Sequence, residues 1–165
     1  MSSRELERTA RPSVLDRLID TEPKLAGDPP QTLAQSVAAT KRGVLRDLEW
    51  LLNTRRICDP APESLTELQR SVYHFGLPDV TSLSADDPGT RSRLQRSIEA
   101  AIQFFEPRLT QVRVTLSPPV KDGPRRVRFI IEGVLRMEPN PERVVFDTYL
   151  DVGSGRILVS GDVNA

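Results

Sequence analysis

The sequence predicts a single α+β domain in which N-terminal helices, one short and three longer, pack on a small antiparallel four-stranded meander. Apolar residues recur with a period near 3.6 before Pro107, and the period changes to about 2 after it. With 165 residues, the chain is long enough to bury one core and too short for two ordinary domains. No segment repeats at a fixed period, which excludes a solenoid.

The first part of the chain, residues 1–30, is predicted to be a mobile tail followed by a short amphipathic docking helix. Within 13–20, four apolar residues recur at helical spacing: Val14, Leu15, Leu18 and Ile19. So short a helix is not stable alone, and a stretch with Pro and Gly, 23–30, separates it from the rest. It therefore packs loosely on its own domain or docks on another protein. We expect docking, with Leu15 and Leu18 in the contact.

Residues 31–165 are expected to form the single domain, and residues that cap or break helices delimit its three longer helices. Ser64 followed by Glu67 matches a capping box at the start of the second helix. Gly76 suits the left-handed position after that helix. An aspartate followed by proline opens the third helix, where the missing N–H of proline costs nothing. The expected bounds are Gln31 to about Arg56, Ser64 to Gly76, and Pro88 to Pro107.

Alternating apolar and polar residues predict the strands of the meander. In the longest strand, alternate apolar residues should point inward, while Ile130 and Val134 suggest that the opposite face is partly covered. A Gly-Ser-Gly turn joins the last two strands. The expected strands cover residues 111–116, 126–137, 143–150 and 156–160.

Charge is balanced overall but unevenly distributed. Residues 91–136 carry ten Lys or Arg against four acidic residues, a net charge of +6. Such a region can bind nucleic acid, bind an acidic protein, or remain a solvated face. Aromatic residues are not interleaved with these charges as an RNA-binding sheet requires, so a nucleic-acid-binding module is the least favoured function. An acidic protein surface accounts for the same arginines more simply.

Residues suited to catalysis are few. The single cysteine, Cys58, excludes an internal disulfide and a multi-cysteine metal site. The single histidine, His74, has no nucleophile motif to pair with, so we interpret it as a packed or half-exposed residue. We therefore expect no enzyme, with no catalytic residue, no bound metal and no cofactor.

The sequence also indicates where the protein resides. No apolar run approaches the length of a membrane span, and the charged N-terminus lacks the apolar stretch of a signal peptide. A chain without disulfides has no need of an oxidising compartment. We expect a cytoplasmic protein that is not embedded in a membrane.

Three stretches together resemble a known family: residues 46–56 (RDLEWLLNTRR), 71–79 (SVYHFGLPD) and 105–109 (FEPRL). The chain is similar to the TssE family of type VI secretion system baseplate subunits and to the wedge protein of contractile phage tails. The opening residues 13–18 (SVLDRL) also look like the N-terminal segment of the type VI members, which favours protein secretion over a phage tail. The similarity extends from about Pro12 to the C-terminus.

This resemblance implies a structural subunit of the baseplate wedge. It implies binding to the baseplate proteins TssF, TssG and TssK, a role in starting assembly of the contractile sheath of TssB and TssC, and a position beneath the inner membrane. It also assigns Glu106, Pro107 and Arg108 to a contact with the helical core of the wedge.

Two alternatives remain open at Glu106. The first is that Glu106 and Arg108 pair internally and brace the junction between helix and strand. The second is a lysozyme-like enzyme that degrades peptidoglycan, which requires a carboxylic acid held in its protonated form. An arginine two residues away favours the ionised carboxylate instead, so we expect no such activity. For the sheath, we expect an edge strand of the meander to accept a strand from the partner.

Overall fold

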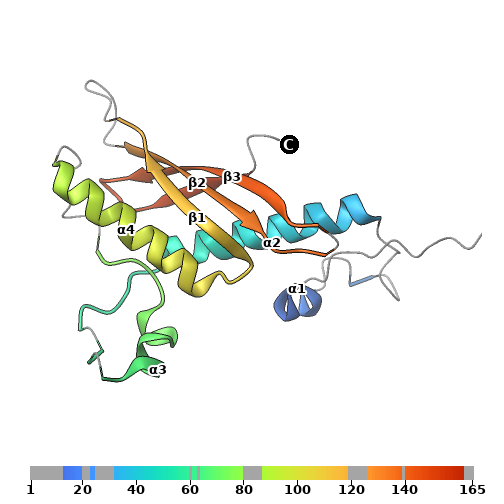
Figure 1. Ribbon diagram of the computed structural model, residues 1–165, viewed down its shortest axis with the longest axis horizontal. Helices are drawn as coiled ribbons and strands as arrows, with labels where there is room; N and C mark the ends of the chain where they lie inside the picture. Colours follow the sequence, from blue (N-terminus) through green and yellow to red (C-terminus); the bar gives the residue numbers. More distant parts are fainter. Residues whose placement is uncertain are drawn as a thin grey trace, which may run out of the picture.

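The computed structural model confirms the α+β class (Figure 1). The expected tail over residues 1–11 lies outside the described residues. Four α-helices, one 3-10 turn and a four-stranded antiparallel sheet are formed within the described part of the chain. That part comprises residues 13–19, 23–24, 32–59, 61–62, 64–79, 87–118, 126–138 and 140–161.

The sheet is a meander in which every strand pairs with its neighbour in sequence, in the order β1-β2-β3-β4. All three pairings are antiparallel, and the register sets Phe129 opposite Thr148 and Ile131 opposite Phe146. The four predicted strands are therefore confirmed, with ends that move by up to two residues. Their bounds are Leu109–Leu116 (β1), Arg126–Leu135 (β2), Glu142–Asp151 (β3) and Ile157–Ser160 (β4).

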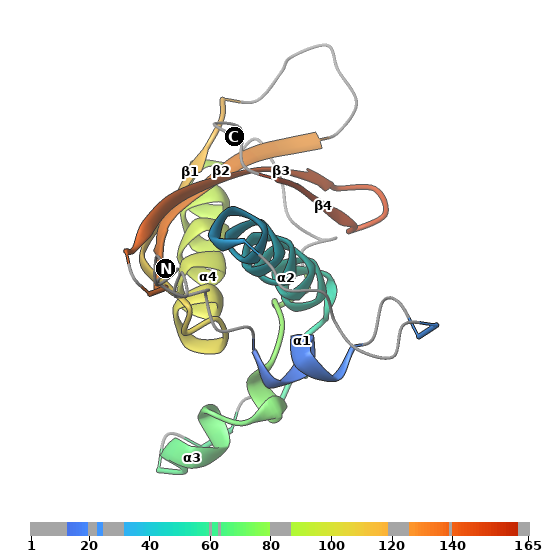
Figure 2. The same ribbon diagram turned by 90° about the vertical axis from the view of Figure 1, so that its right-hand side faces the viewer.

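One face of the sheet is buried, as the alternation requires, and the other mixes charged residues with apolar ones such as Ile130 and Val134, which are half-buried. Phe129 and Ile131 on β2 are fully buried, and so is Val114 on β1. On the opposite face, Arg128 donates two hydrogen bonds to Asp147 across the strand pair. Figure 2 shows the two long helices on the inner face, and within the described part of the chain no helix covers the outer face.

The two long helices, α2 (Leu33–Asn53) and α4 (Pro88–Phe105), pack beneath the sheet. Asp87 caps α4 by accepting a hydrogen bond from the Thr90 N–H, and Pro88 is its first residue, which confirms the predicted start. The C-terminal half of α2 buries four apolar residues at helical spacing, Val44, Leu48, Leu51 and Leu52. Its N-terminal half instead buries small and polar residues, namely Ser36, Thr40 and Gly43.

The prediction of a second long helix is wrong. Its place holds α3 (Thr66–Gln69), only four residues long, and the 3-10 turn η1 (Val72–His74). The Ser71 hydroxyl donates to the Leu68 carbonyl and accepts from the Tyr73 N–H, and such local bonds compete with a continuing helix. The capping box at Ser64 does not form, because α3 has no side-chain cap. Two apolar residues of this segment, Leu65 and Val72, are exposed.

A backbone clip fixes the end of this segment to the end of α2. The Leu77 N–H donates to the Thr54 carbonyl at 2.9 Å, and the Arg56 N–H donates to the Leu77 carbonyl at 2.8 Å. Gly76 has φ of 105°, which confirms the predicted left-handed residue. A Cβ atom on Gly76 would lie 2.3 Å from the Thr54 carbonyl oxygen, so the clip requires glycine on steric grounds as well.

We expect Gly76→Ala to lower the free energy of unfolding by about 1–3 kcal/mol, because alanine is strained at this φ and its Cβ displaces Thr54. Urea unfolding followed by circular dichroism measures this loss. The control is Gly89→Ala in the first turn of α4, whose Cβ meets only ordinary contacts and should leave stability unchanged or slightly higher. Equal midpoints for the two variants would show that the clip does not depend on Gly76.

Candidate partner-binding site

The motif Glu106-Pro107-Arg108 forms the turn between α4 and β1. The Glu106 N–H closes the last turn of α4 by donating to the Ile102 carbonyl at 2.8 Å. The Leu109 N–H then donates back to the Glu106 carbonyl at 3.0 Å, with Pro107 in the second position of the turn, which its fixed φ suits. The sequence thus ends the helix and reverses the chain within four residues.

Within this turn, Arg108 folds back onto Glu106. Its Nε donates to Glu106 Oε1 at 2.6 Å, and its Nη2 donates to the other carboxylate oxygen. The Glu106 side chain is only 5% exposed and that of Arg108 21%. The hydrogen bonds to Glu106 raise the pKa of Arg108 above its ordinary value, although burial opposes the charged form. The internal brace considered for these two residues is therefore formed.

Asp47 connects this pair to α2. One of its carboxylate oxygens accepts a hydrogen bond from Arg108 Nη2. The other accepts from Nε and Nη2 of Arg46, at 2.9 and 2.8 Å. Arg46 also lies over the ring of Trp50, with its guanidinium carbon 5.2 Å from the ring centroid. The turn and the middle of α2 are thus joined by charge-assisted hydrogen bonds.

Asp16 brings the short helix α1 (Val14–Leu18) to the same place. Its Oδ1 accepts from Arg46 Nη2 at 2.8 Å, and its Oδ2 lies 3.5 Å from Arg108 Nη1. Ser13 caps α1 and also donates to Asp16 Oδ2. Burial opposes the charged form of Asp16, but the hydrogen bonds from Ser13 and Arg46 outweigh it and hold the pKa below its ordinary value. The acid–arginine cluster comprises Asp16, Arg46, Asp47, Glu106 and Arg108.

A glycine on α2 makes room for this arrangement. A Cβ atom at Gly43 would lie 3.0 Å from both carboxylate oxygens of Asp16, closer than ordinary van der Waals contact. Gly43 is buried even though it lies in the middle of a helix, where glycine is unfavourable. The close approach of α1 accounts for glycine at this position.

The docking of α1 leaves its apolar side chains in solvent. Its polar residue Asp16 faces the body of the protein, while the apolar face of α1 points away from it. Helices that pack on their own domain normally do the reverse. The apolar face consists of Val14, Leu15, Leu18 and Ile19, with exposed fractions of 73%, 43%, 76% and 41%.

Sequence reasoning identified only part of this site. It singled out Glu106, Pro107 and Arg108, which lie at the centre, and Leu15 and Leu18, which lie on the exposed face of α1. It missed three members of the cluster, Asp16, Arg46 and Asp47. A signal was present, because these three belong to the stretches 13–18 and 46–56 that carry the family resemblance. The structure brings both stretches together with the third, 105–109.

The chemistry of the cluster is that of a charged scaffold. Both oxygens of Glu106 accept hydrogen bonds from Arg108, so this carboxylate is not placed as a proton donor to a substrate. His74 Nε2 accepts a hydrogen bond from the Ala61 N–H at 3.2 Å, a packing role. Among the described residues, no three His, Cys, Asp or Glu side chains gather where a metal ion could bind. None of the described helices combines the length and apolar character that crossing a membrane requires.

Comparison with known proteins identifies the chain as a structural baseplate subunit. Residues 38–140 match the family described as baseplate wedge protein gp25. Because this match covers more than half of the chain, the protein belongs to that family, and the resemblance to baseplate wedge subunits is confirmed.

The chain is similar to one in a solved structure described as the baseplate complex from the type VI secretion system. The two are 22% identical, with a TM-score of 0.46, over 66% of this chain and 91% of that one. No curated protein matches.

We expect Arg108→Ala to destabilise the protein by about 3 kcal/mol, because it leaves the buried Glu106 carboxylate without its cation. The free energy of unfolding from urea titration measures the effect. Arg113→Ala on β1 is the matched control: this arginine is exposed, and its loss should change stability by less than about 0.5 kcal/mol. If both variants unfold at the same midpoint, the cluster contributes nothing to the fold.

Gly43→Ala should loosen the attachment of α1 without lowering the overall stability of the protein. Alanine favours the middle of α2 by up to about 1 kcal/mol, while its Cβ pushes against Asp16 and loosens α1. We therefore expect an unchanged or higher melting temperature together with faster trypsin cleavage after Arg17, which lies within α1. Mass spectrometry of the digest follows that one bond, with Gly89→Ala as the control. Unchanged cleavage would mean that Asp16 does not hold α1 in place.

Proposed function

We propose that this protein is a TssE-type wedge subunit of the type VI secretion baseplate. In this role it binds TssF, TssG and TssK, and it helps to start assembly of the sheath of TssB and TssC. The observation that carries the proposal is the convergence of the stretches 13–18, 46–56 and 105–109 on one acid–arginine cluster, beside an exposed apolar helix face. These are three of the four stretches that carry the family resemblance. Membership of the wedge family supports it.

The apolar face of α1 supplies the contact area for a partner. Contiguous apolar side chains on a surface mark sites of protein interaction, and four of them lie on this short helix. A helix that presents such a face suits a hydrophobic groove or a helix bundle on the partner. Because Asp16 fixes the helix beforehand, less ordering entropy is lost when the partner binds.

The turn motif contributes both contact and positioning. Pro107 is exposed and Arg108 partly so, and these two residues can touch a partner directly. Glu106 is 4% exposed, so its role is to orient Arg108. The internal brace and the partner contact are compatible: the brace sets the position of the surface that the partner meets.

Sheath contact is proposed at an edge of the sheet, and β1 and β4 are the two edge strands. Each edge is partly occupied by a side chain. Glu99 accepts a hydrogen bond from the Val114 N–H on β1 at 2.8 Å. On β4, the Asn53 side chain bonds both the N–H and the carbonyl of Ile157, at 2.9 and 2.8 Å. An added strand therefore pairs beyond these residues or displaces one of them.

The remaining expectations follow from the proposed assignment. It gives the protein a cytoplasmic position, at the baseplate beneath the inner membrane, and a role as scaffold without catalysis. The engagement of Glu106 by Arg108 argues against a lysozyme-like reaction at that carboxylate.

The proposal is tested by co-purification from cells that make the whole secretion system. We expect tagged protein to recover TssF, TssG and TssK, and Leu18→Asp to reduce their recovery at least about tenfold, since a charge in an apolar contact is strongly unfavourable. Leu18 is 76% exposed, so the fold should be unaffected. Val72→Asp, at another exposed apolar residue, is the control and should recover the partners normally.

Two outcomes would contradict parts of the proposal. Absence of all three partners with the unaltered protein contradicts the baseplate role. Normal recovery with Leu18→Asp contradicts the role of α1. Arg108→Ala serves as a further comparison: recovery lost with Arg108→Ala and kept with Leu18→Asp would place the contact at the turn alone.

A further inference from the structure

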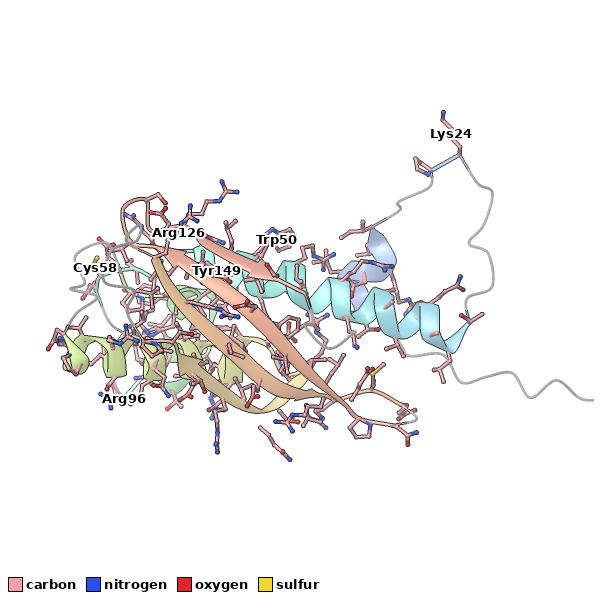
Figure 3. The ribbon with its side chains drawn as sticks, turned by 90° about the horizontal axis from the view of Figure 1, so that it is seen from above. Lys24, Trp50, Cys58, Arg96, Arg126 and Tyr149 are labelled. Carbon is pink, nitrogen blue, oxygen red and sulfur yellow. The ribbon has the colours of Figure 1, made fainter. Side chains whose placement is uncertain are left out.

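A basic cleft lies between α4 and the segment that contains α3 and η1. Its volume is about 480 Å³, within the range typical of ligand sites. Three arginines and His74 line it, and none of its lining residues is Asp or Glu. The arginines are Arg56, Arg93 and Arg96, and Figure 3 shows Arg96 projecting from α4. None of the five acid–arginine residues belongs to this cleft.

The structure also divides the basic region 91–136 into arginines that have acidic partners and arginines that do not. Arg108 belongs to the acid–arginine cluster, and Arg128 is paired with Asp147. Arg96 makes no ion pair with any described residue. Arg93 donates to the Thr90 hydroxyl and acts on Asp87 only at longer range. Of the described arginines in this region without an ion pair, Arg93 and Arg96 lie together at this cleft, while Arg113 and Arg136 lie outside it.

An apolar wall completes the cleft. Phe104 is 47% exposed, and Arg70 lies over its ring with the guanidinium carbon 6.0 Å from the centroid. Phe105 packs edge-on against Phe75, which fixes the wall from behind. A ligand that satisfies this cleft carries negative charge for the arginines and an apolar group for Phe104.

We propose that this cleft binds an acidic segment of a partner protein, with carboxylates on Arg93 and Arg96 and an apolar side chain against Phe104. Arginine binds carboxylates through two parallel hydrogen bonds, which gives geometric specificity as well as attraction. Single-stranded nucleic acid is the weaker fit, because it binds through successive bases stacked on several open aromatic rings. Here one exposed ring is available, and Arg70 already covers one of its faces. This inference does not depend on the proposed baseplate role.

The test is a selection of random twelve-residue peptides on the purified full chain. We expect enrichment of peptides that combine several Asp or Glu with an aromatic or large aliphatic residue. The affinity of the leading peptide, measured by fluorescence anisotropy, should fall at least about tenfold with Arg96→Glu, because charge reversal adds repulsion at the contact. Phe104→Ser should weaken it as well. Arg113→Glu, an exposed arginine outside the cleft, is the control and should change the affinity less than about twofold.

The outcomes decide between the ligand classes. Selected peptides without acidic enrichment, no selected peptides, or equal affinity for the wild type and Arg96→Glu would each overturn the proposal. A twelve-nucleotide single strand of DNA that displaces the peptide at equal concentration would overturn it in favour of nucleic acid. Thermal unfolding of each variant confirms that the exposed substitutions leave the fold intact. Weak displacement by DNA, with loss of peptide binding in Arg96→Glu and Phe104→Ser alone, supports the acidic protein segment.

Discussion

The ion pairs of Arg108, together with the hydrogen bond from Arg46 to Asp16, position most of the surface that we assign to partner binding. The guanidinium bonds Glu106 within its own turn and Asp47 on α2, and it lies 3.5 Å from Asp16 on α1. Three carboxylates from segments distant in sequence therefore meet one cation. A helix of five residues has too few internal bonds to persist alone. The place and orientation of α1 thus follow from this network, and with them the direction in which its apolar side chains point.

The contact between α1 and the rest of the protein is polar, and this has a consequence that an apolar contact would not have. Apolar packing would bury the side chains of α1 in the protein's own core and leave none for another protein. Ion pairs that are partly buried add little net stability, since desolvation offsets much of their attraction, but they fix geometry. The cluster therefore orients α1 and leaves Leu15, Leu18 and their neighbours exposed. The attendant cost is an apolar patch that is prone to aggregation until it is covered.

The sequence predicted well those features that depend on periodicity and local capping. The helices α2 and α4, the four strands, the N-cap at Asp87 and the left-handed Gly76 all follow from local rules. The prediction of a long second helix was wrong because the Ser71 side chain forms hydrogen bonds to nearby backbone groups. A periodic pattern of apolar residues does not reveal such bonds. Periodicity also shows which face of α1 is apolar, but not whether that face meets its own core or solvent. In the sequence, nothing distinguishes three members of the cluster from ordinary solvated charges: Asp16, Arg46 and Asp47. Only the fold, which brings distant segments together, reveals their role.

The two candidate surfaces differ in chemistry, and this difference bears on how a wedge subunit keeps its partners apart. The apolar face of α1 offers hydrophobic area fixed by charges beneath it. The basic cleft offers charge, with Phe104 as its apolar wall. An acidic segment placed on the apolar face would lose hydration without gaining a cation, and an apolar helix placed in the cleft would leave arginines desolvated and unpaired. Each surface therefore disfavours the ligand of the other, so two partners can bind one small subunit without competing.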